Sequence, residues 1–397
     1  MGKELIIYHL HTTLSLLDST TWFAEYLDEA KKRGLRAIGV SEHGHIFNWA
    51  KNMKMCKKNK DKEGDYDIKY LFGMEIYLTE THEGKKVRDN YHTILIAKNL
   101  DGARELCKVA TMAQAKERRH YNPRISFDEF LGLSNNIIAI SACLGGALNK
   151  LDEMNPYYDR LVNRYDFLEI QGHNIEDQIS YNKNLLALSK KYNKPLIFGT
   201  DTHSLDNYGL ECRKILMSAK GMQYGDEEKF NLTFLTYDEA LSMCKVQNAI
   251  PVDEYVKALD NTVVLADMVE SYKLDDSFKY PDHLYDNPRD SFYKRIRECI
   301  RRKKGINALS PNFYNKYLDH VKEEYEILSD QGMQGFLLFL SEMIEWCDSV
   351  GIPVGFGRGS VAGSTIAYIL GITDVDPIVW NTIFSRFCNS ERISLAD

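Results

Sequence analysis

Histidine and carboxylate residues that could bind metal ions are concentrated in the first half of this 397-residue sequence. Nine of the eleven histidines precede residue 204. His9 and His11 form an H-x-H pair, and Asp201 and His203 form a D-x-H pair. Because alternate residues of a β-strand face the same side, each pair can direct two ligand atoms at one centre. Two such pairs predict a metal site, with zinc, manganese or iron as the ions.

Four further candidate ligands lie at or near the ends of apolar segments between these pairs: His43, Glu75, His92 and Cys143. A single histidine in such a position is more often hydrogen-bonded than metal-bound, but the combination favours a metal site. A tetrahedral zinc site needs only four ligands, so this larger set predicts a cluster of two or three ions. Ions about 3.5–4 Å apart can hold the attacking and leaving oxygens of a phosphoryl group and activate water. The residues themselves therefore indicate a metal-dependent phosphoesterase.

The apolar segments that precede or contain these candidates predict β-strands. They span residues 36–41, 70–77, 92–97, 137–141, 167–170 and 195–200. Near-continuous apolar strands are typical of a parallel sheet or barrel covered by helices. Helical spacing predicts a first helix that Ser19 and Thr20 can cap, and later helices near 100–115, 176–192 and 206–219. This alternation predicts an α/β barrel, where the carboxyl ends of the strands converge on one face.

The pattern changes in the last third of the chain. Residues 237–269 predict two more helices, and a polar stretch at 274–283 then interrupts the alternation. We place a domain boundary within residues 275–288. Three helical segments follow, near 290–303, 311–331 and 334–350, and after them come a strand, a loop and a helix.

Composition excludes several classes of protein. The formal net charge is −7, hydrophobic residues make up 44% and charged residues 27%, so a disordered, collagen-like or coiled-coil chain is excluded. No apolar run approaches the length of a membrane span, and the N-terminus does not resemble a signal peptide. Eight dispersed cysteines make disulfides unexpected and fit a reducing cytoplasm.

A glycine-rich loop follows the predicted strand at 352–356 and opens a helix. Glycines allow close approach of the backbone to an anion, and free amides at a helix N-terminus attract phosphate. Serine hydroxyls and an arginine can add hydrogen bonds and charge. The candidate phosphate-binding residues are Gly357, Arg358, Gly359, Ser360, Gly363 and Ser364. The loop alone leaves a simple tight turn as the alternative.

Two basic segments are candidates for contact with nucleic acid. The first, residues 116–124, contains Arg118, Arg119 and Arg124, and the second spans residues 294–304. Such segments are equally often solvated surfaces, so both interpretations stay open.

The motif at residues 9–18 resembles the opening of the polymerase and histidinol phosphatase (PHP) domain of bacterial DNA polymerase III alpha subunits. Residues 41–45, 73–75, 91–99, 141–144 and 201–203 resemble later motifs of that domain. The resemblance implies a trinuclear centre whose ligands are His9, His11, Asp18, His43, Glu75, His92, Cys143, Asp201 and His203. Glu42 stands where the family usually has Asp, and we expect it to orient His43. Glu169 and His173 also match the family, with supporting or structural roles as open as catalytic ones. Residues 116–124 resemble a loop near this site.

Residues 351–364, 368–377 and 384–394 resemble the polymerase palm of the same family. In that family the glycine-rich loop grips the triphosphate of the incoming nucleotide. Phe356, Val361, Ser390 and Ala396 replace its usual Pro, Ala, Pro and Pro, and none of these changes removes a phosphate-binding group. The family continues with a Pro-Asp-x-Asp-x-Asp string that holds two magnesium ions. Here the sequence ends at the first carboxylate, Asp397, so we expect this chain alone not to polymerise DNA.

The resemblance implies a PHP-type distorted (β/α)7 barrel over residues 1–275, a linker at 276–288 and an incomplete α+β palm at 289–397. The implied enzyme is a replicative DNA polymerase with a hydrolytic PHP site, in the family a proofreading-type 3′–5′ exonuclease. Its cofactors would be two or three divalent ions (zinc, manganese or iron) in the PHP site and magnesium in the complete polymerase. The implied partners are primer-template DNA, deoxynucleoside triphosphates, the remaining polymerase polypeptide, a sliding clamp and other replisome subunits, in the cytoplasm of a bacterial or phage-infected cell. A catalytically silent scaffold and a stand-alone phosphatase are the alternatives.

Overall fold

The computed structural model describes residues 3–57, 68–82, 89–219, 221, 229–275, 281–302 and 311–389. The chain divides into two compact units, Met1–Leu274 and Asp275–Asp397, which we call the first and second unit. Each has its own buried apolar core. Ser390, Ala396 and Asp397, which the palm resemblance involves, lie outside the described residues.

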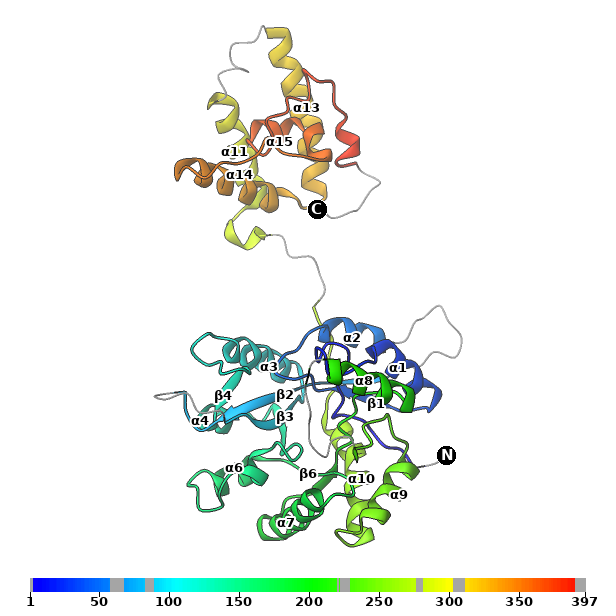
Figure 1. Cartoon of the computed structure of the whole chain (residues 1–397). Coiled ribbons are helices and arrows are strands. Elements are labelled where there is room, and N and C mark those ends of the chain that lie inside the picture. The colour runs from blue at the N-terminus through cyan, green and yellow to red at the C-terminus, as the bar shows by residue number, and fades with distance from the viewer. Residues whose placement is uncertain are drawn as a thin grey trace. The chain divides into compact units, whose positions relative to one another are not determined.

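The first unit contains a mixed sheet and a separate pair of strands (Figure 1). The mixed sheet has the order β1-β2-β3-β5, with β4 also paired to β2; β1/β2 and β2/β4 are parallel, whereas β3 runs antiparallel to both β2 and β5. β6 and β7 form a parallel pair. The strands are β1 (Ala37–Val40), β2 (Lys69–Thr79), β3 (Tyr91–Ala97), β4 (Arg124–Ser126), β5 (Ile137–Ile140), β6 (Leu168–Ile170) and β7 (Leu196–Phe198).

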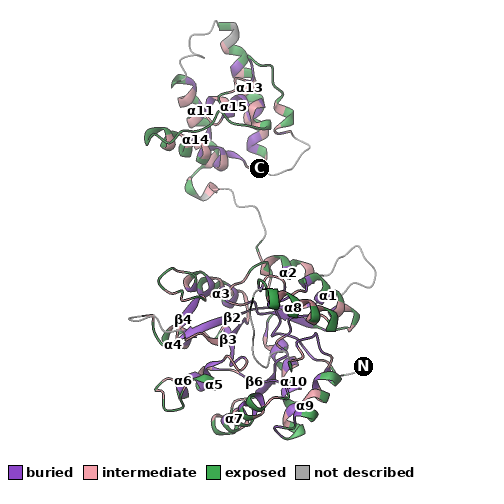
Figure 2. Cartoon of the chain, in the orientation of Figure 1, coloured by how far each residue is buried: buried purple, intermediate pink, exposed green. Residues whose placement is uncertain are grey.

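All six strands expected from the apolar segments are present, but the expectation of a wholly parallel sheet was wrong. β3 runs antiparallel to its neighbours because the connections between strands set the direction of each strand. An apolar run in the sequence carries no information about those connections. The short β4 was not predicted. Figure 2 shows β2 and β6 as buried, as expected for strands covered on both faces.

Single bridges and one extended segment connect the two sheets. Ile140 at the end of β5 pairs with Phe167 before β6. On the other side, residues 7–11 hydrogen-bond both to β1, through Gly39 N to Ile7 O at 2.8 Å, and to Thr202 after β7, through His11 N to Thr202 O at 2.8 Å. Among the described residues, the strands therefore do not form the predicted closed seven-stranded barrel as one continuous sheet. The segment that begins the chain nevertheless lies between β1 and the end of β7, which is what positions the first two histidines.

Helices pack around these strands (Figure 1). They are α1 (Phe23–Lys32), α2 (Trp49–Cys56), α3 (Leu100–Ala113), α4 (Phe127–Leu131), α5 (Ala147–Lys150), α6 (Tyr158–Arg164), α7 (Glu176–Tyr192), α8 (Asn207–Ala219), α9 (Tyr237–Gln247) and α10 (Val252–Met268). The apolar face predicted for α1 is buried. Its predicted caps were wrong: α1 begins after Trp22, whose amide donates to the Glu25 carboxylate at 2.8 Å. Ser19 instead donates to the carbonyls of His11 and His203, at 2.9 and 2.8 Å.

The second unit is helical over its described residues. It contains η2 (Pro281–Leu284), α11 (Pro288–Arg302), α13 (Pro311–Asp330), α14 (Gln334–Ser349), η3 (Ser360–Gly363), α15 (Thr365–Ile369) and η4 (Phe384–Arg386). Its core includes Phe292, Leu328, Leu337 and Ile366. The strand expected at 352–356 is wrong, since that stretch is exposed and forms no ladder within the described residues. A strand needs a neighbouring strand to accept its backbone hydrogen bonds. None of the described helices in either unit combines the length and the apolar character needed to cross a membrane.

Candidate metal centre

His9 and His11 are fully buried at the end of the segment that lies between β1 and the residues after β7. Their Nε2 atoms both face Asp201 Oδ1, at 3.1 Å from His9 and 3.4 Å from His11. Both also face Glu75 Oε2, at 3.7 and 3.4 Å. The H-x-H pair therefore points two imidazoles at one centre, as its spacing predicts.

Glu75 on β2 lies in the middle of the candidate ligands. Its Oε2 is 3.0 Å from His43 Nδ1, and its Oε1 contacts His92 Nδ1 on the neighbouring strand β3. The thiol of Cys143, which follows β5, lies 3.6 Å from the same His92 nitrogen. The central strand β2 and its antiparallel neighbour β3 thus bring ligands from three predicted motifs together.

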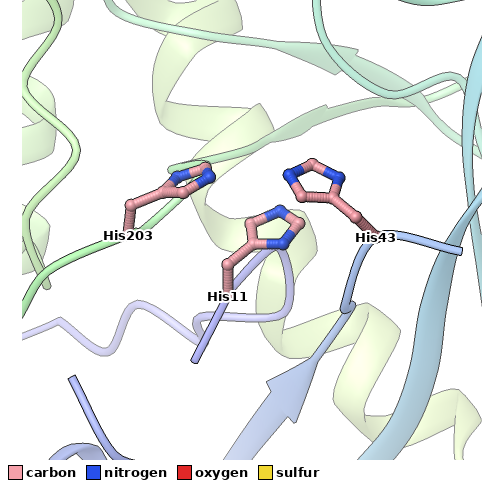
Figure 3. Close-up of side chains that lie close together, drawn as sticks. All are labelled: His11, His43 and His203. Atoms are coloured by element: carbon pink, nitrogen blue, oxygen red, sulfur yellow. The ribbon is translucent and has the colours of Figure 1, made fainter. Parts of the chain in front are cut away.

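Asp18 contacts two histidines of the cluster, His43 and His203. Its Oδ2 lies 3.1 Å from His43 Nε2 and 3.3 Å from His203 Nε2. Figure 3 shows the rings of His11, His43 and His203 close together, each on a separate segment of chain. The ring of His11 is stacked against those of His43 and His203, with centroids 4.1 and 4.4 Å apart.

Three groups of side chains each have ligand atoms that lie within 4.8 Å of one another, and His11 belongs to two of these groups. They are His9, His11 and Asp201; His11, His43 and His203; and Glu75, His92 and Cys143. Together with Asp18, these groups contain all nine residues predicted as ligands. The chain therefore brings the whole predicted set into one cluster, with enough donors for more than one ion.

The electrostatics of the cluster fit divalent cations. Six buried atoms have no partner with hydrogen-bond geometry in the described structure: His9 Nε2, His11 Nε2, His43 Nδ1, both Glu75 carboxylate oxygens and Asp201 Oδ1. Buried polar atoms without partners are costly, and bound divalent cations would supply the missing partners. Burial alone would raise the pKa of Glu75, but His92 and His43 hold it well below its usual range. Burial likewise opposes ionisation of Asp201, whose pKa His9 and His11 hold low. Ionised carboxylates are the form that binds cations.

Two supporting residues could not be assigned from the sequence. Arg213 on α8 donates to Asp18 Oδ1 at 2.6 Å and to the Asp18 carbonyl at 2.7 Å, and it is nearly buried. Nothing in its surroundings in the sequence distinguishes it from the other basic residues. Ser15 donates to Glu42 at 2.5 Å and lies 3.1 Å from His11 Nδ1. Only its position inside the 9–18 motif could have indicated it.

The expectation that Glu42 orients His43 was wrong. Its carboxylate accepts hydrogen bonds from Thr12 and Ser15, not from the His43 side chain. A longer side chain than Asp reaches back to the loop after His11. Glu42 therefore supports His11 through Ser15.

His173 lies outside the three ligand groups. Its ring is buried, stacks on Phe230 with centroids 4.1 Å apart, and has no hydrogen-bond partner on either nitrogen among the described residues. Burial lowers its pKa to about 4, so the ring is neutral at physiological pH. These observations support a structural role more than a catalytic one.

The basic residues predicted to contact DNA already have partners. Arg124 is buried and pairs with Asp89 at 2.8 Å, which argues against its predicted contact with phosphate. Arg118 pairs with Glu129, and Arg119 also has an interaction within the chain. On α11, Arg295 and Arg302 both pair with Glu345. Ion pairs of exposed side chains are weak, so contact with DNA by Arg118, Arg119 and the 294–304 segment stays a prediction.

The two parts of the glycine-rich loop differ in their exposure to solvent. Its first part, Gly357–Ser360, is exposed, and Gly357 and Gly359 have positive φ angles of 84° and 83° that favour glycine. Gly363 and Ser364 are buried. Ser364 Oγ and the amides of Thr365 and Ile366 donate to the Glu324 carboxylate, at 2.7, 2.7 and 2.9 Å. The predicted role of Ser364 in phosphate binding therefore conflicts with the structure, because Glu324 already occupies the start of α15.

Comparison with known proteins identifies both units. Residues 8–193 match the PHP domain family, and residues 289–397 match the family described as the bacterial DNA polymerase III alpha NTPase domain. The DNA polymerase III subunit alpha of Aquifex aeolicus (strain VF5) is 32% identical over 431 residues, covering 100% of this chain and 36% of that protein. Along its whole length the chain is therefore similar to DNA polymerase III alpha subunits.

A second DNA polymerase III subunit alpha, from Borreliella burgdorferi, is 30% identical and covers 100% of this chain and 35% of its own length. The chain thus spans about a third of the relatives it matches. A solved structure of Endonuclease Q with an abasic 27-mer duplex aligns over 56% of this chain and 57% of its own, at 18% identity and a TM-score of 0.34. A similarity of that size supports no statement about this chain. The match to the PHP domain family and the geometry of the cluster agree on a domain with a site for divalent metal ions.

Proposed function

We propose that the first unit is a metal-dependent phosphodiesterase that removes nucleotides from DNA 3′ ends, within the N-terminal part of a replicative DNA polymerase III alpha subunit. The observation that carries the proposal is the cluster of nine candidate ligands, in which six buried polar atoms have no hydrogen-bond partner among the described residues. The match of the whole chain to the corresponding third of relatives named DNA polymerase III subunit alpha favours DNA as the substrate.

Two or three ions in this cluster would activate water and neutralise phosphate oxygens. His9, His11 and Asp201 would hold one ion, and Glu75, His92 and Cys143 would hold another. The His11, His43 and His203 group, with Asp18 beside it, supplies a third set of donors. Zinc, manganese and iron all suit this mixture of imidazole, carboxylate and thiolate.

Side-chain exposure indicates where the substrate enters. His9 and His11 are 0% exposed, whereas His43 and His92 are 23% and 25% exposed. The phosphodiester would therefore approach the partly exposed ligands, which are His43 and His92 together with Asp18 and Asp201, whose side chains are 19% and 16% exposed. Water, which the hydrolysis consumes, can reach the cluster at these partly exposed ligands.

For the second unit we propose a role in holding the triphosphate of an incoming deoxynucleotide, through the exposed part of the glycine-rich loop. Gly357, Arg358, Gly359 and Ser360 present exposed backbone and one cation. The complete polymerase would use magnesium, primer-template DNA, the remaining polymerase polypeptide and replisome partners such as a sliding clamp. It would act in the cytoplasm of a bacterial or phage-infected cell.

The hydrolase proposal is tested with the purified chain, a 3′-labelled single-stranded DNA and manganese or zinc. We expect release of labelled nucleotide that His11→Ala and Asp201→Ala abolish, because His11 belongs to two of the ligand groups and Asp201 supplies the only carboxylate of one. His320→Ala, a histidine of the second unit on α13, is the control and should leave release unchanged.

Two outcomes would contradict the proposal. Tightly bound metal without any hydrolysis would identify the unit as a silent scaffold for the polymerase. Hydrolysis of small phosphate esters but not of DNA would identify a phosphatase, which would leave the polymerase-like residues 351–389 without a purpose.

A further inference from the structure

Glu169, on β6, is a fully buried carboxylate that contacts a candidate metal ligand from behind. Its Oε1 lies 2.8 Å from His9 Nδ1, the ring nitrogen opposite the one that faces Asp201 and Glu75. Its Oε2 accepts a hydrogen bond from the Tyr8 hydroxyl at 2.9 Å. Glu169 belongs to none of the three ligand groups, so its carboxylate serves His9 and not an ion directly.

The contact fixes which nitrogen of His9 carries hydrogen. An ionised carboxylate can only accept, so the hydrogen of a neutral His9 ring must sit on Nδ1. The Nε2 lone pair is then left facing Asp201 and Glu75, at 3.1 and 3.7 Å. A carboxylate placed behind a histidine in this way orients the ring and makes it a better metal ligand.

Residues that follow the neighbouring strands β5 and β7 make room for the Glu169 side chain, and nearby side chains hydrogen-bond to this residue. A Cβ on Gly199, just after β7, would lie 2.2 Å from Glu169 Cδ and 2.3 Å from its Oε1. Ser141, just after β5, accepts the Glu169 amide hydrogen at 2.9 Å, and Gln171 donates to Oε1 at 2.9 Å. Gly199 has no unusual backbone angle that would explain a glycine there. The glycine is explained by the carboxylate that packs against it.

We propose that Glu169 is a positioning residue that sets the tautomer and orientation of His9, so that His9 Nε2 binds a divalent cation together with His11 and Asp201. The inference rests on the proposed metal centre and deepens it, because it assigns a determinant of metal affinity outside the ligand set. Tyr8 holds Glu169 in turn, through its hydroxyl.

The test measures zinc affinity of the full chain by competition with a chromophoric chelator, alongside thermal unfolding of the metal-free protein. Glu169→Ala should weaken one class of zinc sites by about 10- to 100-fold. Glu169→Gln keeps an acceptor for Nδ1–H and should lose less. Tyr8→Phe removes one hydrogen bond from Glu169 without touching His9, so it should fold normally and lose a few-fold at most. Glu324→Gln, an equally buried glutamate in the second unit, is the matched control and should bind zinc as the unchanged chain does.

A second readout separates positioning from simple structural support. In zinc-loaded protein labelled with 15N-histidine, one metal-bound ring should keep its hydrogen on Nδ1, and this signal should change in Glu169→Gln while the unfolding temperature stays close to that of the parent. Gly199→Ala, which keeps Glu169 but displaces it, should reproduce the loss of zinc affinity.

Unchanged zinc affinity in Glu169→Ala, while His11→Ala loses it, would overturn the inference and leave the metal centre intact. An equal loss in Glu324→Gln would overturn it too, since the effect would then not be specific to His9. Absence of zinc binding in the parent chain would instead contradict the proposed metal centre itself, so the two failures are distinguishable.

Discussion

At the scale of single residues, Arg213 is the cation that completes the outer side of the cluster. It holds one oxygen of Asp18 while the other oxygen faces His43 and His203. We expect Arg213→Ala to raise the manganese concentration needed for half-maximal hydrolysis by about 10- to 100-fold, because Asp18 would lose its fixed orientation. Titration of activity with manganese measures this. Arg104→Ala, an exposed arginine that pairs with Asp101, is the control. Identical metal dependence in both variants would show that Asp18 is held without Arg213.

The ligands could be predicted from the sequence at this scale, but their supports could not. His9, His11 and His203 carry rare chemistry at recognisable spacing, so their residue types already narrow their role. Arg213 is one of 50 basic residues and lies 195 positions from Asp18. No local pattern connects two such distant positions, because their contact is created only by the fold. Glu169 could be singled out by its resemblance to the family, but its contact with Tyr8, 161 positions away, is likewise created only by the fold.

At the scale of elements, the approach of residues 7–9 to β1 decides where the first histidine lies. A Cβ on Gly39 would come 2.9 Å from the Tyr8 Cα and 3.2 Å from its carbonyl oxygen, and neither atom belongs to a movable side chain. We expect Gly39→Ala to destabilise the first unit by about 1–3 kcal/mol and to weaken metal binding, since His9 follows Tyr8 directly. Chemical denaturation with and without zinc measures both effects. Gly355→Ala, where a Cβ would meet nothing within 4 Å, should change neither.

Element positions were predictable from apolar runs, whereas their partners and directions were not. The runs at 70–77 and 92–97 correspond to β2 and β3, yet their antiparallel pairing had to be seen in the structure. The start of α15 shows a similar limit. Gly363 and Ser364 have the composition of a phosphate-binding turn, but Glu324, 40 positions from Ser364, accepts the hydrogen bonds that a phosphate would need. A composition rule cannot detect an internal carboxylate that competes for the same amides.

At the scale of the whole molecule, the separate cores of the two units predict that metal affects only one of them. The ligands all belong to the first unit, whereas the core of the second unit contains none of them. Ions at about 100 times their dissociation constant would stabilise the first unit by about 2.7 kcal/mol. Removing them with a chelator should therefore lower its unfolding temperature by about 5–10 °C and leave the second transition in place. Calorimetry resolves the two, and Glu324→Ala assigns them, because three donors at α15 lose their acceptor at a cost of about 1–3 kcal/mol to the second unit alone. A chelator that shifted both transitions equally would mean that the units unfold as one, and the cluster would then stabilise the polymerase-like part as well as its own.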